Sequence, residues 1–146
     1  MPVTIEIVSP EKLLISRPID MVVVPAEEGD LGVLPGHAPM IVTLRGGFAT
    51  LYDGTMPIGS LFVAGGFAEI TPERCTVLAD QVYQPAELTK SLADQRLSAA
   101  DAAWEAVDKM DVAARDAALA ALQIARAMAA AAEAPLPQPI AAPAKA

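Results

Sequence analysis

Several residue types are scarce in this chain of 146 residues, and each scarcity excludes a class of protein. The single cysteine, Cys75, excludes an internal disulfide and a cysteine-based metal cluster, and its apolar neighbours indicate a small core residue. Lys and Arg number 10 against 18 Asp and Glu, which gives a net charge of −8. Because phosphate backbones select basic surfaces, this balance argues against a nucleic-acid partner.

Long apolar runs are also missing. No window approaches the roughly 18 uninterrupted apolar residues of a membrane-spanning helix, so we expect no direct membrane insertion. The N-terminus has no basic segment followed by an apolar one, so we expect no signal peptide and a cytosolic protein.

Histidine occurs once, as His37, and the chain offers no metal-ligand spacing and no convincing nucleophile. His37 could form a base–acid pair with Glu28 or Asp30, tie down its own loop, or contact a partner at the surface. We favour the surface contact, and we expect no catalytic residue, no cofactor and no metal.

The chain changes character near Pro85. Over residues 1–85, apolar and polar residues alternate with period two and Gly- or Pro-containing turns recur. This pattern predicts about ten short strands in an antiparallel sandwich or barrel. We expect Gly46-Gly47 to be a hairpin turn, Asp53-Gly54 another turn, and Gly65-Gly66 a bulge or tight turn.

Residues 86–134 contain 20 alanines and neither Gly nor Pro, which predicts an antiparallel pair of helices. Asp111 is the expected N-cap of the second helix. Trp104, inside the first helix, is expected to be an anchor for the second helix or the sandwich, with an exposed contact for a partner as the alternative. Alanine contacts bury little area, so detachment of this hairpin from the sandwich is physically reasonable. The tail, residues 135–146, has four prolines and is expected to be disordered.

The segment 27–39, EEGDLGVLPGHAP, combines three acids, three glycines, two prolines and the histidine. Gly and Pro restrict its shape, so we interpret it as a rigid surface loop whose acids suit a basic partner. A solvated charge run is the alternative for Glu27, Glu28 and Asp30.

These motifs resemble the epsilon subunit of bacterial F-type ATP synthases over about residues 3–132. The segments that carry the resemblance are 24–32 (VPAEEGDLG), 34–39 (LPGHAP), 63–70 (VAGGFAEI) and 76–80 (TVLAD). The resemblance implies a ten-stranded sandwich followed by two helices. It also implies a non-catalytic rotor subunit of the proton-translocating enzyme, peripheral at the cytoplasmic face of the bacterial inner membrane.

The resemblance further implies partners. The sandwich would bind the gamma subunit, and the c ring would contact Glu28, Asp30, His37 and Met40. The helical hairpin would be compact, or extended toward the beta subunits to regulate ATP hydrolysis, with Lys109, Arg115 and Arg126 as its possible contacts.

Two departures from the family pattern limit these expectations. Thr89 and Leu92 stand where ATP-binding members carry an acid and an arginine, so we expect no nucleotide to bind. The second helix is also poorer in basic residues than in inhibitory members. A free-standing sandwich that binds a ligand or a partner and dimerises through its helices is the alternative function, and an enzyme ranks third.

Overall fold

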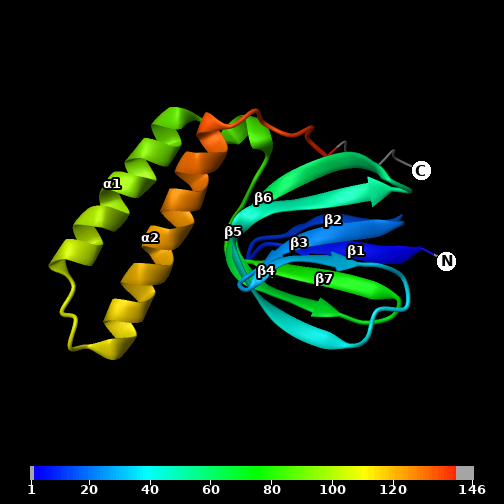
Figure 1. Cartoon of the computed structure of the whole chain (residues 1–146), viewed down its shortest axis with the longest axis horizontal. Coiled ribbons are helices and arrows are strands. Elements are labelled where there is room, and N and C mark those ends of the chain that lie inside the picture. Colours follow the sequence, from blue (N-terminus) through cyan, green and yellow to red (C-terminus); the bar gives the residue numbers. More distant parts are fainter. Residues whose placement is uncertain (1, 141–146) are drawn as a thin grey trace.

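The computed structural model describes residues 2–140, which form a β-sandwich followed by a helical hairpin (Figure 1). The predicted fold class is confirmed. The strands are β1 (Val3–Val8), β2 (Leu13–Ile19), β3 (Met21–Ala26), β4 (Gly29–Val33), β5 (Met40–Asp53), β6 (Met56–Ile70), β7 (Arg74–Ala79) and β8 (Val82–Tyr83). A 3₁₀ turn (Pro85–Glu87) leads to the helices α1 (Lys90–Ala106) and α2 (Val112–Glu133).

Residues 2–140 contain eight strands, two fewer than predicted, because both glycine pairs lie inside long strands. The expected hairpin turn at Gly46-Gly47 is wrong, since these residues pair with Ala64 and Val63 in the β5–β6 ladder. The turn between β5 and β6 is at the predicted Asp53-Gly54, where Gly54 has a φ of 60°.

The glycine pair Gly65-Gly66 bends β6 without shifting the register of its pairing with β5. Both φ angles are positive, 86° and 114°. Leu61 and Val63 before the bend and Ala68 and Ile70 after it belong to the main core, so the side chains that point into this core change from odd to even positions at the bend. The bend folds the long β5–β6 hairpin over, and this produces the two layers of the sandwich.

The layers differ in the strands that flank the folded hairpin. On one side β6 pairs with β7, β7 with β1, and β1 with β2; on the other side β5 pairs with β3, and β3 with β4. All pairs are antiparallel, as predicted, except β1–β7, which is parallel.

The main core lies between the layers and is almost entirely aliphatic. Ile5, Val24, Leu51 and Val77 are completely buried in it. Cys75 belongs to the same cluster, and burial raises the pKa of its thiol to about 12. The thiol is therefore a core group and not a reactive one.

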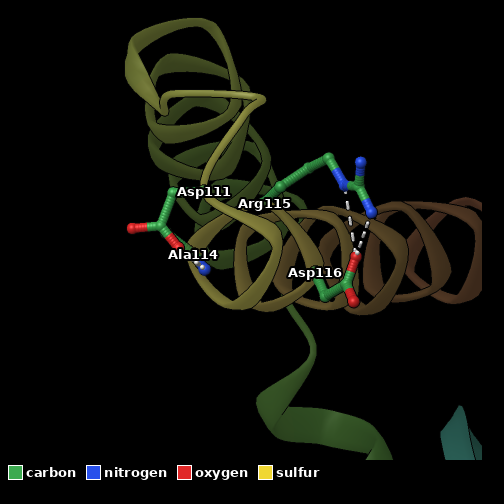
Figure 2. A network of polar contacts seen from close by, with 4 residues as sticks. All are labelled: Asp111, Ala114, Arg115 and Asp116. Carbon is green, nitrogen blue, oxygen red and sulfur yellow. Dashed lines mark hydrogen bonds and ion pairs between the residues drawn. The ribbon is translucent and has the colours of Figure 1, made fainter.

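Side-chain caps determine where the helices begin. The Thr89 hydroxyl accepts a hydrogen bond from the Leu92 N–H (3.1 Å) and so starts α1. The Asp111 carboxylate accepts the Ala114 N–H (3.2 Å), as Figure 2 shows, which confirms the predicted N-cap of α2. Thr89, the first departure from the family's ATP motif, thus has a structural role.

The helices pack on each other through small side chains. Ala100, Leu122 and Ala125 form a cluster between α1 and α2, with Leu97 and Trp104 against it. Trp104 therefore anchors α1 on α2, as expected.

Helix α2 lies on the outer surface of the folded β5–β6 hairpin. Phe62 and Ala64 of β6 form a cluster with Met128 of α2. A Cβ atom at Gly46 would lie 3.2 Å from the Ala127 Cβ and 3.3 Å from the Ile124 Cα. The absence of a side chain at Gly46 thus permits the close approach of α2 to β5.

The C-terminal segment differs from the expected disorder over residues 135–140. The Ser60 N–H of β6 donates to the Gln138 carbonyl (2.8 Å), and Ile140 is buried in the main core cluster. Composition alone did not reveal this order, because the segment is held by an exposed strand edge elsewhere in the chain. Residues 141–146, the rest of the expected tail, lie outside the described residues.

Candidate functional site

The acidic part of the segment 27–39 is a tight turn between β3 and β4. Glu27 and Glu28 are exposed at its tip, and Asp30 is exposed on β4. The pairing of Ala26 with Gly29 closes the turn, and the Glu27 N–H donates to the Thr43 carbonyl of β5 (2.8 Å). These backbone bonds hold three carboxylates, the acidic turn of residues 27–30, at a fixed position on the sandwich.

Asp30 has an internal partner. Its carboxylate forms an ion pair with the Arg45 guanidinium of β5, and both side chains remain largely exposed. Within residues 2–140 neither Glu27 nor Glu28 takes part in an ion pair. The turn therefore keeps an excess of negative charge in spite of Arg45, as a basic partner would require.

His37 lies in the loop that follows β4, and Met40 begins β5 three residues before Thr43, whose carbonyl accepts the Glu27 N–H. This loop is held by a hydrogen bond from the Gly36 N–H to the Pro72 carbonyl (2.7 Å), and Met40 pairs with Ile70. Three residues of β4 follow Asp30, which corresponds to about 10 Å along the strand before the His37 loop begins. Met40 is at a similar distance along β5 from Thr43, and its neighbour Ile41 lines a pocket with Glu27 and Glu28. A single contact surface of Glu28, Asp30, His37 and Met40 stays a prediction.

The structure also bears on the proposed base–acid pair. The His37 Nδ1 lies 2.8 Å from the carbonyl oxygen of its neighbour Ala38, and within residues 2–140 neither Glu28 nor Asp30 forms an ion pair with His37. The geometry fits a side chain that is tied to its own loop and gives His37 no carboxylate partner from the acidic turn.

Two of the three basic residues suggested for the beta subunits have contacts within the hairpin. The Lys109 ammonium donates to the carbonyls of Trp104 and Val107 at the end of α1 and lies 4.6 Å from the centre of the Trp104 ring. Arg115 pairs with the adjacent Asp116 at 3.3 Å (Figure 2). Arg126 is exposed on α2 and is in no ion pair of residues 2–140.

A second surface was not anticipated from the sequence. A row of neighbouring side chains crosses four strands on the outside of the layer that α2 leaves uncovered, from Leu13 through Val8 and Leu78 to Phe67. Ile41 lies on the same side of β5. Leu13, Phe67 and Ile41 are 53%, 46% and 69% exposed. We name these five residues the open face.

The open face had a sequence signal. Ile7-Val8 and Val77-Leu78 place two aliphatic residues in succession on strands that otherwise alternate. Since successive side chains on a strand point to opposite faces, each of these pairs makes both faces of its strand apolar. Such a patch on the outside of a sandwich indicates an interaction surface.

No helix among residues 2–140 has the length and apolarity needed to cross a membrane. Across residues 2–140, no three His, Cys, Asp or Glu side chains gather as metal ligands.

Comparison with known proteins gives one consistent result. The family model of the ATP synthase delta/epsilon chain β-sandwich domain matches residues 2–85. The ATP synthase epsilon chain of Granulibacter bethesdensis is 61% identical over 125 residues, which cover 86% of this chain and 93% of the relative. That of Gluconacetobacter diazotrophicus is 45% identical over 127 residues, which cover 87% and 90% of the two chains.

Solved structures share the fold at lower identity. A chain of the Euglena gracilis mitochondrial ATP synthase, in a structure of OSCP, F1 and c ring, matches with a TM-score of 0.69 and 22% identity over 89% of this chain and 81% of that one. A chain from the central stalk and c ring of the Tetrahymena thermophila enzyme gives a TM-score of 0.64 and 14% identity, over 90% and 97%.

Proposed function

Because the chain belongs to the ATP synthase delta/epsilon chain family, we propose that it joins the gamma subunit to the c ring in the central stalk of a proton-translocating F-type enzyme. As a family member it is a non-catalytic stalk subunit of ATP synthase. The observation that carries the proposal is the 61% identity to an epsilon chain, which extends over 86% of the chain and so beyond the sandwich. A free-standing ligand-binding module has no comparable support.

We propose that the acidic turn contacts the c ring. Its three carboxylates are presented on a short, hydrogen-bonded turn, so little conformational entropy is lost when a basic loop binds there. A basic residue of the ring would compete with Arg45 for Asp30 and would also attract Glu27 and Glu28. Met40 lies three residues before Thr43, which bonds to the turn, and we propose that Met40 and His37 extend the same contact.

Asp30→Lys is expected to weaken binding to the c ring by about tenfold or more, because it replaces an attraction by a repulsion at the interface. Binding of the purified protein to detergent-solubilised c ring, measured at several salt concentrations, tests this. The sandwich should remain folded, since an exposed ion pair such as Asp30–Arg45 contributes at most about 1 kcal/mol.

Asp53→Lys is the matched control for this variant. Asp53 is equally an exposed acid at a strand end, and it lies beside the β5–β6 turn away from the acidic turn. An equal loss of affinity in both variants would mean that only net charge matters, and it would contradict the assignment of the turn.

We propose that the open face binds the gamma subunit. Its side chains form a continuous apolar row. Strands β1, β6 and β7 are paired with a neighbouring strand on both sides, so a partner would contact their side chains and not a free strand edge. A large, relatively rigid apolar surface of this kind suits a permanent subunit contact.

The position of the subunit follows from these two contacts. A protein that binds the c ring and the gamma subunit would be peripheral at the membrane surface that carries the catalytic head, the cytoplasmic face of the inner membrane in bacteria.

We propose that the helical hairpin is a separate regulatory module. It contacts the sandwich mainly through α2, and alanines contribute much of the contact. An interface of small side chains is compatible with a compact and an extended state of similar free energy. Contact with the beta subunits would fall mainly to Arg126, since Lys109 and Arg115 have partners within the hairpin.

Removal of residues 85–146 is therefore expected to leave proton coupling intact, because the acidic turn and the open face both precede residue 85. ATP-driven proton pumping by the reassembled enzyme, normalised to ATP hydrolysis, measures the coupling. Failure of the shortened protein to assemble with the gamma subunit and the c ring would contradict the division into two modules.

A further inference from the structure

We infer that residues 135–140 form a C-terminal latch that holds α2 against the sandwich. The inference stands on contacts within the chain and does not depend on the proposed role in ATP synthase. It concerns how the hairpin is kept in the compact arrangement seen in Figure 1, in which the segment after α2 runs back over the sandwich.

The latch occupies an edge of β6 that is otherwise open. On one side β6 pairs with β5 along most of its length, and on the other with β8 at Phe62 and Val63 and with β7 from Gly66 onward. On that second side, the only bridge that residues 2–140 make to β6 before Phe62 joins Ser60 to Pro139 in parallel. The Ser60 N–H donates to the Gln138 carbonyl at 2.8 Å. An unpaired strand edge can form hydrogen bonds with a strand of another chain. Covering this edge therefore also protects the protein against aggregation.

Proline suits this position. In a parallel bridge one residue bonds to the residues before and after its partner, so Pro139, opposite Ser60, needs no N–H of its own. The latch contains three prolines, Pro135, Pro137 and Pro139, which restrict its conformations before it binds. The entropy lost on docking is correspondingly small.

Ile140 inserts its side chain into the main core. It is 8% exposed, whereas Leu136, the other large aliphatic residue of the latch, is 44% exposed. A Cβ atom at Gly59 would lie only 2.6 Å from the Ile140 Cα. The glycine therefore provides the space in which Ile140 lies, and the site is specific for a chain that passes directly over it.

The latch follows the cap residue of α2 directly, with no linker residues between them. The cap residue Ala134 still donates its N–H to Ala130 (3.2 Å), and the latch begins at the next residue. Pro135 and Pro137 line a groove of about 630 Å³ whose other walls are α2, at Ala127 and Ala131, and the sandwich. Residues 135–140 can span at most about 20 Å, so α2 cannot move far from the sandwich unless Ile140 leaves the core.

Release of the latch and departure of the hairpin are therefore coupled. A change that removes Ile140 from the core lowers the free energy needed to detach α2. Conversely, detachment of α2 lowers the free energy needed to remove Ile140 from the core. Detachment would also expose the first part of the β6 edge as a site for strand addition.

The reactivity of an introduced cysteine measures this coupling in the full chain. Met128→Cys places a thiol between α2 and the sandwich, in the cluster that contains Phe62. Ala125→Cys places one in the separate cluster between α1 and α2. The native Cys75 does not interfere, because its thiol is completely buried. The reaction of a thiol reagent at position 128 then reports detachment of the hairpin from the sandwich, and its reaction at position 125 reports opening between the helices.

Two changes remove the latch: deletion of residues 135–146 and Ile140→Asp. Each should raise the modification rate of the thiol at position 128 on the order of tenfold, the effect of losing one buried aliphatic side chain. The thiol at position 125 should react as before. Deletion of residues 141–146 alone and Leu136→Ser are the matched controls, and both should leave the rate at position 128 unchanged.

Three outcomes would overturn the latch. The first is an unchanged rate at position 128 in both latch variants. The second is an equal rise at positions 125 and 128, which would make residues 135–140 a general stabiliser. The third is an equal effect of Leu136→Ser and Ile140→Asp. Circular dichroism at low denaturant ensures that each comparison is made between folded proteins.

Discussion

Gly66→Ala is expected to lower the free energy of unfolding by about 4 kcal/mol or more, most of the stability of a small domain. A Cβ atom at this position would lie 2.1 Å from the Leu78 carbonyl oxygen and 2.9 Å from the Ala79 Cα, both backbone atoms of the paired strand β7. The φ angle of 114° is itself unfavourable for alanine. Relief would require β6 and β7 to separate at the bend that creates the two layers. Urea denaturation measures the effect.

Gly32→Ala is the control for this prediction. Gly32 also lies in a strand, but its φ is not in the positive region, and a Cβ atom there would meet only the Met21 sulfur at 3.8 Å. The substitution should change stability by about 0.5 kcal/mol at most. If Gly66→Ala cost no more than this control, the bend at Gly65-Gly66 could not be the structural requirement that we describe.

Phe67→Asp is expected to weaken binding of the gamma subunit by about 100-fold. Phe67 stands in the row Leu13, Val8, Leu78 and Phe67 of the open face, and truncating or charging an aromatic residue at the centre of an interface costs about 2–4 kcal/mol. The sandwich should fold normally, because the side chain is about half exposed in the isolated protein. Calorimetric titration of the purified gamma subunit provides the measurement.

Met56→Asp separates a specific loss from a general effect of the new charge. Met56 is an exposed apolar residue at the β5–β6 turn, outside the open face. Its replacement should leave the affinity for gamma unchanged. Equal affinities of the Phe67→Asp variant and the unaltered protein would show that gamma binds another surface.

Local signals predicted the parts of this fold that depend on local interactions. Asp111 was predictable as an N-cap because the cap bonds a residue three positions along the same helix. The pair Gly46-Gly47 was not, because a glycine pair between apolar runs fits a turn as well as a bend inside a strand. Only the pairing with Ala64 and Val63, far along the chain, decides between them.

The candidate site shows the same limit. The composition of residues 27–39 correctly indicated a constrained, exposed acidic segment, but its proximity in sequence suggested that Asp30 and His37 act together. The structure shows no direct bond between them: Asp30 pairs with Arg45, and the loop of His37 is bonded to Pro72 in the turn after β6. The role of Ile140 was also hidden, since a proline-rich tail acquires order here only through Gly59 and the open edge beside it.

The parallel pairing of β1 with β7 has a consequence for synthesis of the chain. Strand β1 carries Val3, Ile5 and Ile7, all completely buried, yet its second neighbour β7 ends only at Ala79. During translation one backbone edge of β1 therefore stays unpaired until β7, near the end of the sandwich sequence, has left the ribosome. Pairings so distant in sequence form slowly and leave a nascent chain exposed to aggregation. The first strand to be made is thus among the last to be completed, and factors that shield nascent chains would act on this domain through β1.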